Sequence, residues 1–204
     1  MSNRSCFGAL MALFVVLFAV LAVSPREPAT WAMENAVAVL FVIGLWATRR
    51  WFRFSRSAYL MMFSFLALHE IGAHYTYSHV PYDQTLHALF GFSPDAVMGW
   101  QRNQYDRFLH LLYGLLLVLP LSELCREWGG LRRPAAALFA FTLILASSLL
   151  YELIEWGAAV ALGDGSTAFL GTQGDPWDAQ KDMALATVGA LASLVIAALA
   201  RRIR

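Results

Sequence analysis

Apolar residues occur in six long runs along this chain, separated by short polar segments. Each run approaches or exceeds the roughly 20 mostly apolar residues that an α-helix needs to cross a bilayer. The separating segments are rich in Gly, Pro and Arg, as turns and loops are. The pattern therefore predicts transmembrane helices at 6–23, 32–48, 57–77, 105–124, 135–162 and 179–200.

Composition supports a membrane protein. The 204 residues are 59% hydrophobic and only 14% charged, whereas soluble domains average about 25% charged residues. We find no internal repeat and no linker, so we expect one integral membrane domain over 1–204, an all-α bundle of six transmembrane helices. The small residues of "ALATVGALASL" in the last run would let two helices approach closely.

The first run resembles a secretory signal peptide, because Arg4 precedes an apolar core. That core is longer than the usual 7–15 residues, and Pro25 follows the plausible cleavage site. We therefore expect a retained helix.

Basic residues are distributed unequally between the two sides that six alternating helices define. One side carries Arg4, Arg49, Arg50, Arg53, Arg56, Arg126, Arg132, Arg133, Arg201, Arg202 and Arg204. The other carries only Arg26, Arg102, Arg107 and Lys181. Basic residues favour the cytoplasmic side, so we expect a multi-pass protein of the bacterial inner membrane with both termini cytoplasmic and 78–104 external. Cys6 and Cys125 then lie at the reducing face, and we interpret both as free thiols.

Ionisable residues of separate helices are predicted to share one depth, the outer third of the membrane. At 1.5 Å per residue, Glu70 and His74 lie about 20 and 26 Å from the cytoplasmic start of their helix. The other predicted helices bring further ionisable residues to the same depth, namely Glu34, Asp106, His110, Glu152, Glu155, Asp178, Lys181 and Asp182.

Helical spacing places these residues in stripes. Glu70, His74 and Tyr77 follow i, i+4, i+7, and Asp106, His110 and Tyr113 repeat that spacing. Each helix presents one polar stripe, as a cluster inside a bundle requires.

Several of these residues also have a purely structural interpretation. Asp106 and Asp178 could cap helices, Glu34 could be the first-turn acid of its helix, and His79 and His87 of the loop could be satisfied packing residues. Glu123 and Glu127 are expected to be solvated or paired with Arg126. A structural network could also account for the whole set. We favour function, because ionisable residues within a membrane are functional by default.

The chemistry of this set suits a divalent metal ion such as Zn, Mn or Fe. "HEIGAH" is not the zincin motif, because its two histidines are five residues apart and cannot share a helix face. A metal would therefore need ligands from several helices, for example His74, His110 and either Glu152 or Glu155. Glu70, Asp106, Glu152 and Asp182 are the candidate catalytic acids and bases. The same groups without metal could relay protons.

The external segment 78–104 mixes aromatic residues with Pro, Gly and short polar residues. It could form a lid over the cluster, or an aromatic belt at the membrane interface.

Four ordered blocks resemble a known family. "LHEIGAHYTYSHVPYD", "RNQYDRFLHLLYGLLL", "YELIEWGAA" and "LGTQGDPWDAQKDMALATVGA" are similar to the YjdF family of bacterial inner-membrane proteins, over about residues 30 to 195. The resemblance implies a polytopic inner-membrane protein and implies no activity, since that family is of unknown function.

A fainter resemblance is to the VanZ-like membrane proteins. Their pattern of Asp-Lys/Arg-x-x-His matches Asp106 to His110, a later acid matches Glu152, and a final Asp matches Asp182, followed by Gly189. The chain departs from that family at Glu155, where Gln is frequent, and at Ala186, where Asn is.

Three classes of function remain open. The first is a metal-dependent enzyme acting on a lipid-linked or amphiphilic substrate at the outer leaflet. The second is a transporter or proton-coupled carrier, and the third is a structural membrane protein. The expected partners are the bilayer and such a substrate. No nucleic acid is expected, and nothing in the sequence indicates an oligomeric state. The cytoplasmic halves of the helices contain few polar residues, which favours the enzyme over the carrier.

Overall fold

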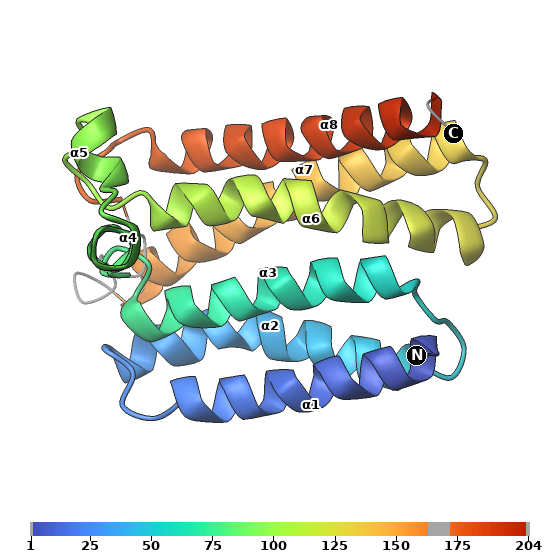
Figure 1. Ribbon diagram of the computed structural model, residues 1–204, viewed down its shortest axis with the longest axis horizontal. Helices are drawn as coiled ribbons and strands as arrows, with labels where there is room; N and C mark the ends of the chain where they lie inside the picture. Colours follow the sequence, from blue (N-terminus) through green and yellow to red (C-terminus); the bar gives the residue numbers. More distant parts are fainter. Residues whose placement is uncertain (1, 163–171, 203–204) are drawn as a thin grey trace.

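The computed structural model describes residues 2–162 and 172–202, and within them the chain forms eight α-helices and no strand (Figure 1). Residues 163–171, in the segment between the last two predicted helices, lie outside the described residues. The helices are α1 (Asn3–Leu21), α2 (Pro28–Thr48), α3 (Arg56–Tyr75), α4 (Tyr82–Phe90), α5 (Pro94–Met98), α6 (Tyr105–Glu127), α7 (Arg133–Leu162) and α8 (Asp178–Arg202). The six long helices coincide with the six predicted runs to within a few residues.

The long helices form one elongated bundle of two halves, α1–α3 and α6–α8, which meet where α3 packs against α6 (Figure 1). Both chain termini lie at one end, together with the connections 49–55 and 128–132; we call this the arginine end. α4 and α5 lie at the opposite end, together with the connection 22–27; we call this the cap end.

Within the part of the chain that the structure describes, five helices are long and apolar enough to span a membrane: α1, α2, α6, α7 and α8. α3 is 20 residues long but is not among these five, because it carries His69, Glu70 and His74 among its apolar residues. Apolarity alone therefore supports five of the six predicted spans.

α6 packs more extensively against α8 than against any other helix. Small residues make this possible, as "ALATVGALASL" predicts. A Cβ at Gly114 would lie 1.9 Å from the Ala186 carbonyl oxygen, and a Cβ at Gly189 would lie 2.1 Å from the Leu111 carbonyl oxygen. The two backbones are thus in direct contact.

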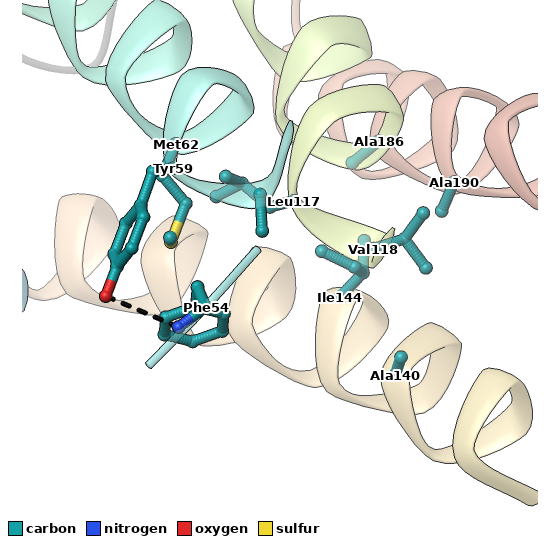
Figure 2. Packing of buried hydrophobic residues seen from close by; sticks show 10 residues of the cluster. Phe54, Tyr59, Met62, Leu117, Val118, Ala140, Ile144, Ala186 and Ala190 are labelled. Carbon is teal, nitrogen blue, oxygen red and sulfur yellow. Dashed lines mark hydrogen bonds between the residues drawn. The ribbon is translucent and has the colours of Figure 1, made fainter. Parts of the chain in front are cut away.

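An apolar core joins both halves towards the arginine end. Val118 of α6, Ile144 of α7 and Ala190 of α8 point toward one another and are fully buried (Figure 2). Met62 and Leu117 extend this core to α3. The bundle interior on this side is therefore closed by apolar side chains.

Glu123 has a different role from the one predicted. Its carboxylate accepts hydrogen bonds from the backbone N–H and the hydroxyl of Ser55, the N-cap of α3. Only Glu127 pairs with Arg126, at 2.9 Å on the surface. Glu123 thus links α6 to the start of α3. A carboxylate that accepts hydrogen bonds at a helix N-terminus is favourable.

Candidate metal centre

Three helices bring four ionisable side chains together at the cap end. Asp106 and His110 lie one turn apart at the start of α6, Asp182 lies in the second turn of α8, and Glu152 comes from α7. The potential ligand atoms of Asp106, His110 and Asp182 all lie within 4.8 Å of one another. We call these four residues the carboxylate–histidine cluster.

Distances within the cluster are too long for good hydrogen bonds. His110 Nε2 lies 3.5 Å from Asp106 Oδ1 and 3.8 Å from Glu152 Oε1. Two ligands that share a tetrahedral metal at about 2.1 Å are themselves about 3.4 Å apart. The spacing around His110 therefore fits side chains that share one metal ion better than side chains that hydrogen-bond to each other.

Two carboxylate oxygens of the cluster lack hydrogen-bond partners among the described residues, although both are buried. They are Glu152 Oε1, the atom that faces His110, and Asp182 Oδ1. An unpaired buried carboxylate oxygen is costly. A bound cation would supply the missing partner to these two oxygens.

A second group of polar residues borders the cluster. Glu34 of α2 accepts a hydrogen bond from the Tyr151 hydroxyl of α7, and the Tyr151 ring contacts the His110 ring at 6.3 Å between centroids. Glu155 lies close enough to Glu34 and Glu152 to interact with both electrostatically. Glu34 is buried in the second turn of α2, because that helix begins at Pro28, so the interpretation of Glu34 as a first-turn acid is wrong.

Arginine–aspartate pairs lie near the cluster at the cap end, around the starts of α6 and α8. Arg102 pairs with Asp178, and Arg107 pairs with both Asp175 and Asp178. Hydrogen bonds from Lys181, the Trp177 backbone N–H and Arg107 lower the pKa of Asp175 to about 2. Asp178, which pairs with both Arg102 and Arg107, is an ion-paired residue at the start of α8.

The segment 78–104 contains α4 and α5 and lies at the cap end (Figure 1). Tyr82 of α4 donates its hydroxyl hydrogen to Asp95 of α5 at 2.5 Å, and the same hydroxyl accepts from the Gln104 backbone N–H. Asp83 accepts from the Ser93 hydroxyl and the Asp95 backbone N–H. Burial and the adjacent Asp95 raise the pKa of Tyr82 to about 12. These bonds fix α4 and α5 to each other and to the start of α6.

The predicted stripe of Glu70, His74 and Tyr77 is broken by the end of α3. Thr76 and Tyr77 have positive φ angles of 57° and 46°, which ends the helix. The Tyr77 ring folds back over Gly72, where a Cβ would lie 2.6 Å from the ring, and the Tyr77 hydroxyl bonds to His69 Nδ1 at 2.6 Å.

Glu70 and His74 also have different surroundings. Glu70 is fully buried, and neither carboxylate oxygen has a hydrogen-bond partner among the described residues. His74 Nδ1 bonds to the Leu21 carbonyl oxygen at 2.8 Å, at the end of α1. His74 is not part of the group formed by Asp106, His110 and Asp182, and its metal role stays a prediction.

Sequence reasoning thus identified Asp106, His110, Glu152 and Asp182 as neighbours from their matched depths. It missed the Tyr151–Glu34 bond and the arginine–aspartate pairs. The signal for the pairs was present, because Arg102 and Arg107 flank the start of α6, and Asp175 and Asp178 lie at the start of α8, at the same end of the bundle.

Known proteins resemble this chain over most of its length. The family described as "Predicted membrane protein (DUF2238)" matches residues 7–203. The inner membrane protein YjdF of Escherichia coli (strain K12) is 36% identical over 177 residues, which cover 86% of this chain and 81% of the relative. No solved structure matches the chain.

Proposed function

Because the chain belongs to the DUF2238 family of predicted membrane proteins, we propose that it is a multi-pass protein of the bacterial inner membrane with six transmembrane helices. α3 is the sixth helix. It runs from the arginine end to the cap end beside α1 and α6 (Figure 1), and two of the polar residues that lower its apolarity, His69 and Glu70, are buried within the protein. Such a helix can cross a bilayer without exposing these charges to lipid.

The arginine end is cytoplasmic in this proposal, and both termini lie there. Arg4, the arginines of 49–56, and Arg132 and Arg133 all lie at that end, which agrees with the preference of basic residues for the cytoplasm. The carboxylate–histidine cluster then faces the outer leaflet.

The cluster holds one divalent cation. The observation that carries this proposal is the position of Glu152 Oε1, buried and unpaired, 3.8 Å from His110 Nε2. Asp106 and Asp182 complete a set of three carboxylates and one imidazole, a combination that suits Mn, Fe or Zn. The Asp106 and His110 side chains are 16% and 13% exposed, so the proposed ligands are not sealed from their surroundings.

A cation bound there would act as a Lewis acid next to the outer leaflet. We therefore favour a metal-dependent enzyme that acts on a lipid-linked or amphiphilic substrate. In this scheme Asp106, His110, Glu152 and Asp182 hold the ion, and the neighbouring Glu155 and Glu34–Tyr151 pair can accept or donate a proton.

The alternative of a transporter is less well supported. A carrier needs a polar route through the bundle, but Val118, Ile144, Ala186 and Ala190 fill the interior towards the arginine end and are fully buried. The alternative of a structural protein predicts that the cluster contributes to stability without binding metal.

Metal analysis of the protein purified in detergent without chelators tests the proposal. We expect about one ion per chain, with loss of the ion in His110→Ala and in Glu152→Gln. His74→Ala is the matched control, because His74 lies at the same end but bonds to Leu21, and it should retain the ion.

Two outcomes would contradict the proposal. A wild-type protein without metal, even after reloading with Mn²⁺, Fe²⁺ or Zn²⁺, would leave a proton-relay or structural role. Loss of metal in His74→Ala with retention in Glu152→Gln would assign the ligands to His74, His110 and Glu155 instead.

The enzymatic part needs its own measurement. Membrane lipid extract incubated with metal-loaded protein should change in composition by mass spectrometry, and the change should be absent with His110→Ala. An unchanged extract, with the ion fully bound, would contradict a lipid-modifying activity.

A further inference from the structure

A second candidate site lies at the arginine end, opposite the carboxylate–histidine cluster. α1 and α2 both pack against α3 but make little direct contact with each other. Between them is a cavity of about 850 Å³. Its size lies within the range of small-molecule binding sites.

The lining of this cavity is amphipathic along the membrane normal. Its mouth carries four arginines and an asparagine, and its wall is formed mainly by apolar residues of α1 and Trp46 of α2. The lining residues are Asn3, Arg4, Phe7, Gly8, Met11, Ala12, Val15, Trp46, Arg49, Arg50, Arg53 and Tyr59. No acidic residue is among them.

The four arginines are not neutralised within the part of the chain that the structure describes. None of Arg4, Arg49, Arg50 and Arg53 forms an ion pair there, in contrast to Arg107 and Arg126. The Arg49 guanidinium lies over the Trp46 ring, 3.7 Å from its centroid, which holds this charge against the apolar wall. A concentrated positive charge above an apolar cavity favours an anionic amphiphile.

We propose that this cavity binds one anionic phospholipid, with its phosphate at the arginines and one acyl chain between α1 and α2. From Arg4 to Val15 the cavity wall follows α1 for eleven residue steps, about 16 Å. That length is about half of a bilayer core of roughly 30 Å, which is the depth that one acyl chain occupies. The site is independent of the proposed metal centre.

Native mass spectrometry of the detergent-solubilised protein tests this inference, with phosphatidylglycerol and phosphatidylethanolamine of identical acyl chains as probes. The wild-type protein should retain phosphatidylglycerol selectively. Loss of two arginines, in Arg49→Gln/Arg53→Gln, should weaken its binding about 25-fold, taken as about fivefold per arginine. Arg132→Gln/Arg133→Gln removes the same charge at the same end but outside the cavity lining, and should leave binding unchanged.

A cavity-filling variant tests the acyl-chain part without a change in charge. A Cβ at Gly8 meets no atom within 4 Å, so Gly8→Leu should fold normally, fill the cavity and abolish retention of the lipid. Gly44 is equally open but does not line the cavity, so Gly44→Leu is the matched control. Inorganic phosphate at millimolar concentration should not displace the lipid.

Three results would overturn the proposal. The first is equal retention of the two lipids by the wild-type protein. The second is equal loss of binding in the two double arginine variants, which would indicate general surface charge. The third is evidence of a simple anion site without an acyl chain, given either by wild-type retention in Gly8→Leu or by displacement with inorganic phosphate.

Discussion

Gly114 on α6 and Ala186 on α8 are in backbone contact, and this contact sets the approach of two cluster residues. His110 lies one turn before Gly114, and Asp182 lies one turn before Ala186. The helices run in the same direction from the cap end (Figure 1). Since a Cβ on Gly114 would lie 1.9 Å from the Ala186 carbonyl oxygen, any larger residue must separate the two helices.

Gly114→Ala should therefore reduce both stability and metal content. Overpacking a tight contact costs about 1–3 kcal/mol, which we expect as a lower free energy of unfolding in a detergent–SDS titration. Gly44→Ala, at an open helical position, should be neutral or stabilising by up to about 1 kcal/mol. If Gly114→Ala unfolded like Gly44→Ala, the helices would not be in direct contact.

Tyr77→Phe should destabilise the end of α3. The variant leaves His69 Nδ1 buried without the hydroxyl that it bonds at 2.6 Å, and an unpaired buried polar group costs about 1–3 kcal/mol. The same SDS titration measures the loss. Tyr75→Phe is the control, because the Tyr75 hydroxyl makes no hydrogen bond with another described residue. Equal effects of the two substitutions would contradict a specific His69–Tyr77 bond.

Asp175 should give the cap end an acid-sensitive contribution to stability. Its pKa is about 2, lowered from 3.8 by hydrogen bonds from Lys181, Trp177 N–H and Arg107. The folded state therefore binds fewer protons than the unfolded state, so the contribution is complete above about pH 5 and is lost as the pH falls from 3.8 to 2.

The difference in Tm between wild-type protein and Asp175→Asn isolates this contribution from other carboxylates. At pH 6 the variant should melt below the wild type, and the two Tm values should converge towards pH 2. A difference that is already absent at pH 6, or that persists unchanged at pH 2, would refute the assigned ion pairs.

Glu123→Ala should cost more than Glu127→Ala, although the two acids are one turn apart. Glu123 bonds both the backbone N–H and the hydroxyl of Ser55, and loss of such a cap costs about 1–2 kcal/mol. Glu127 is 55% exposed and pairs with Arg126 on the surface, which is worth less than about 1 kcal/mol. Denaturant titration of both variants checks the order, and a reversed order would contradict it.

The sequence predicted the long helices well because their main determinant, a run of apolar residues, is local. It also predicted that Asp106 and Asp182 would meet, because depth in a membrane follows from counting residues along each helix. A soluble protein offers no such common axis. The close contact at Gly114 was signalled by small residues on α8, although the partner helix could not be named.

The remaining features depend on geometry that apolar patterns do not encode. Thr76 and Tyr77 adopt positive φ angles, although neither is a residue type that favours them, so the stripe continued in the prediction beyond the true end of α3. His74 precedes this end and still lies within α3, where it bonds to Leu21; its metal role stays a prediction. The pairing of Tyr151 with Glu34 depends on how α2 and α7 rotate about their axes, which spacing within each helix leaves free.

The bundle should insert with the arginine end in the cytoplasm. Both termini lie at the arginine end (Figure 1), so reporters at the two termini must report the same side of the membrane. A cytoplasmic reporter fused after Arg204 should be active, and an external reporter inserted near Pro94, at the start of α5, should be active in the same cells. The physical reason is the concentration of arginines in the connections 49–55 and 128–132, which hold these loops in the cytoplasm.

A fusion after Cys125, near the end of α6, is the internal control and should also report cytoplasm. If the terminal fusion were external and the Pro94 insertion cytoplasmic, the carboxylate–histidine cluster would face the inner leaflet, and a substrate at the outer leaflet would be ruled out.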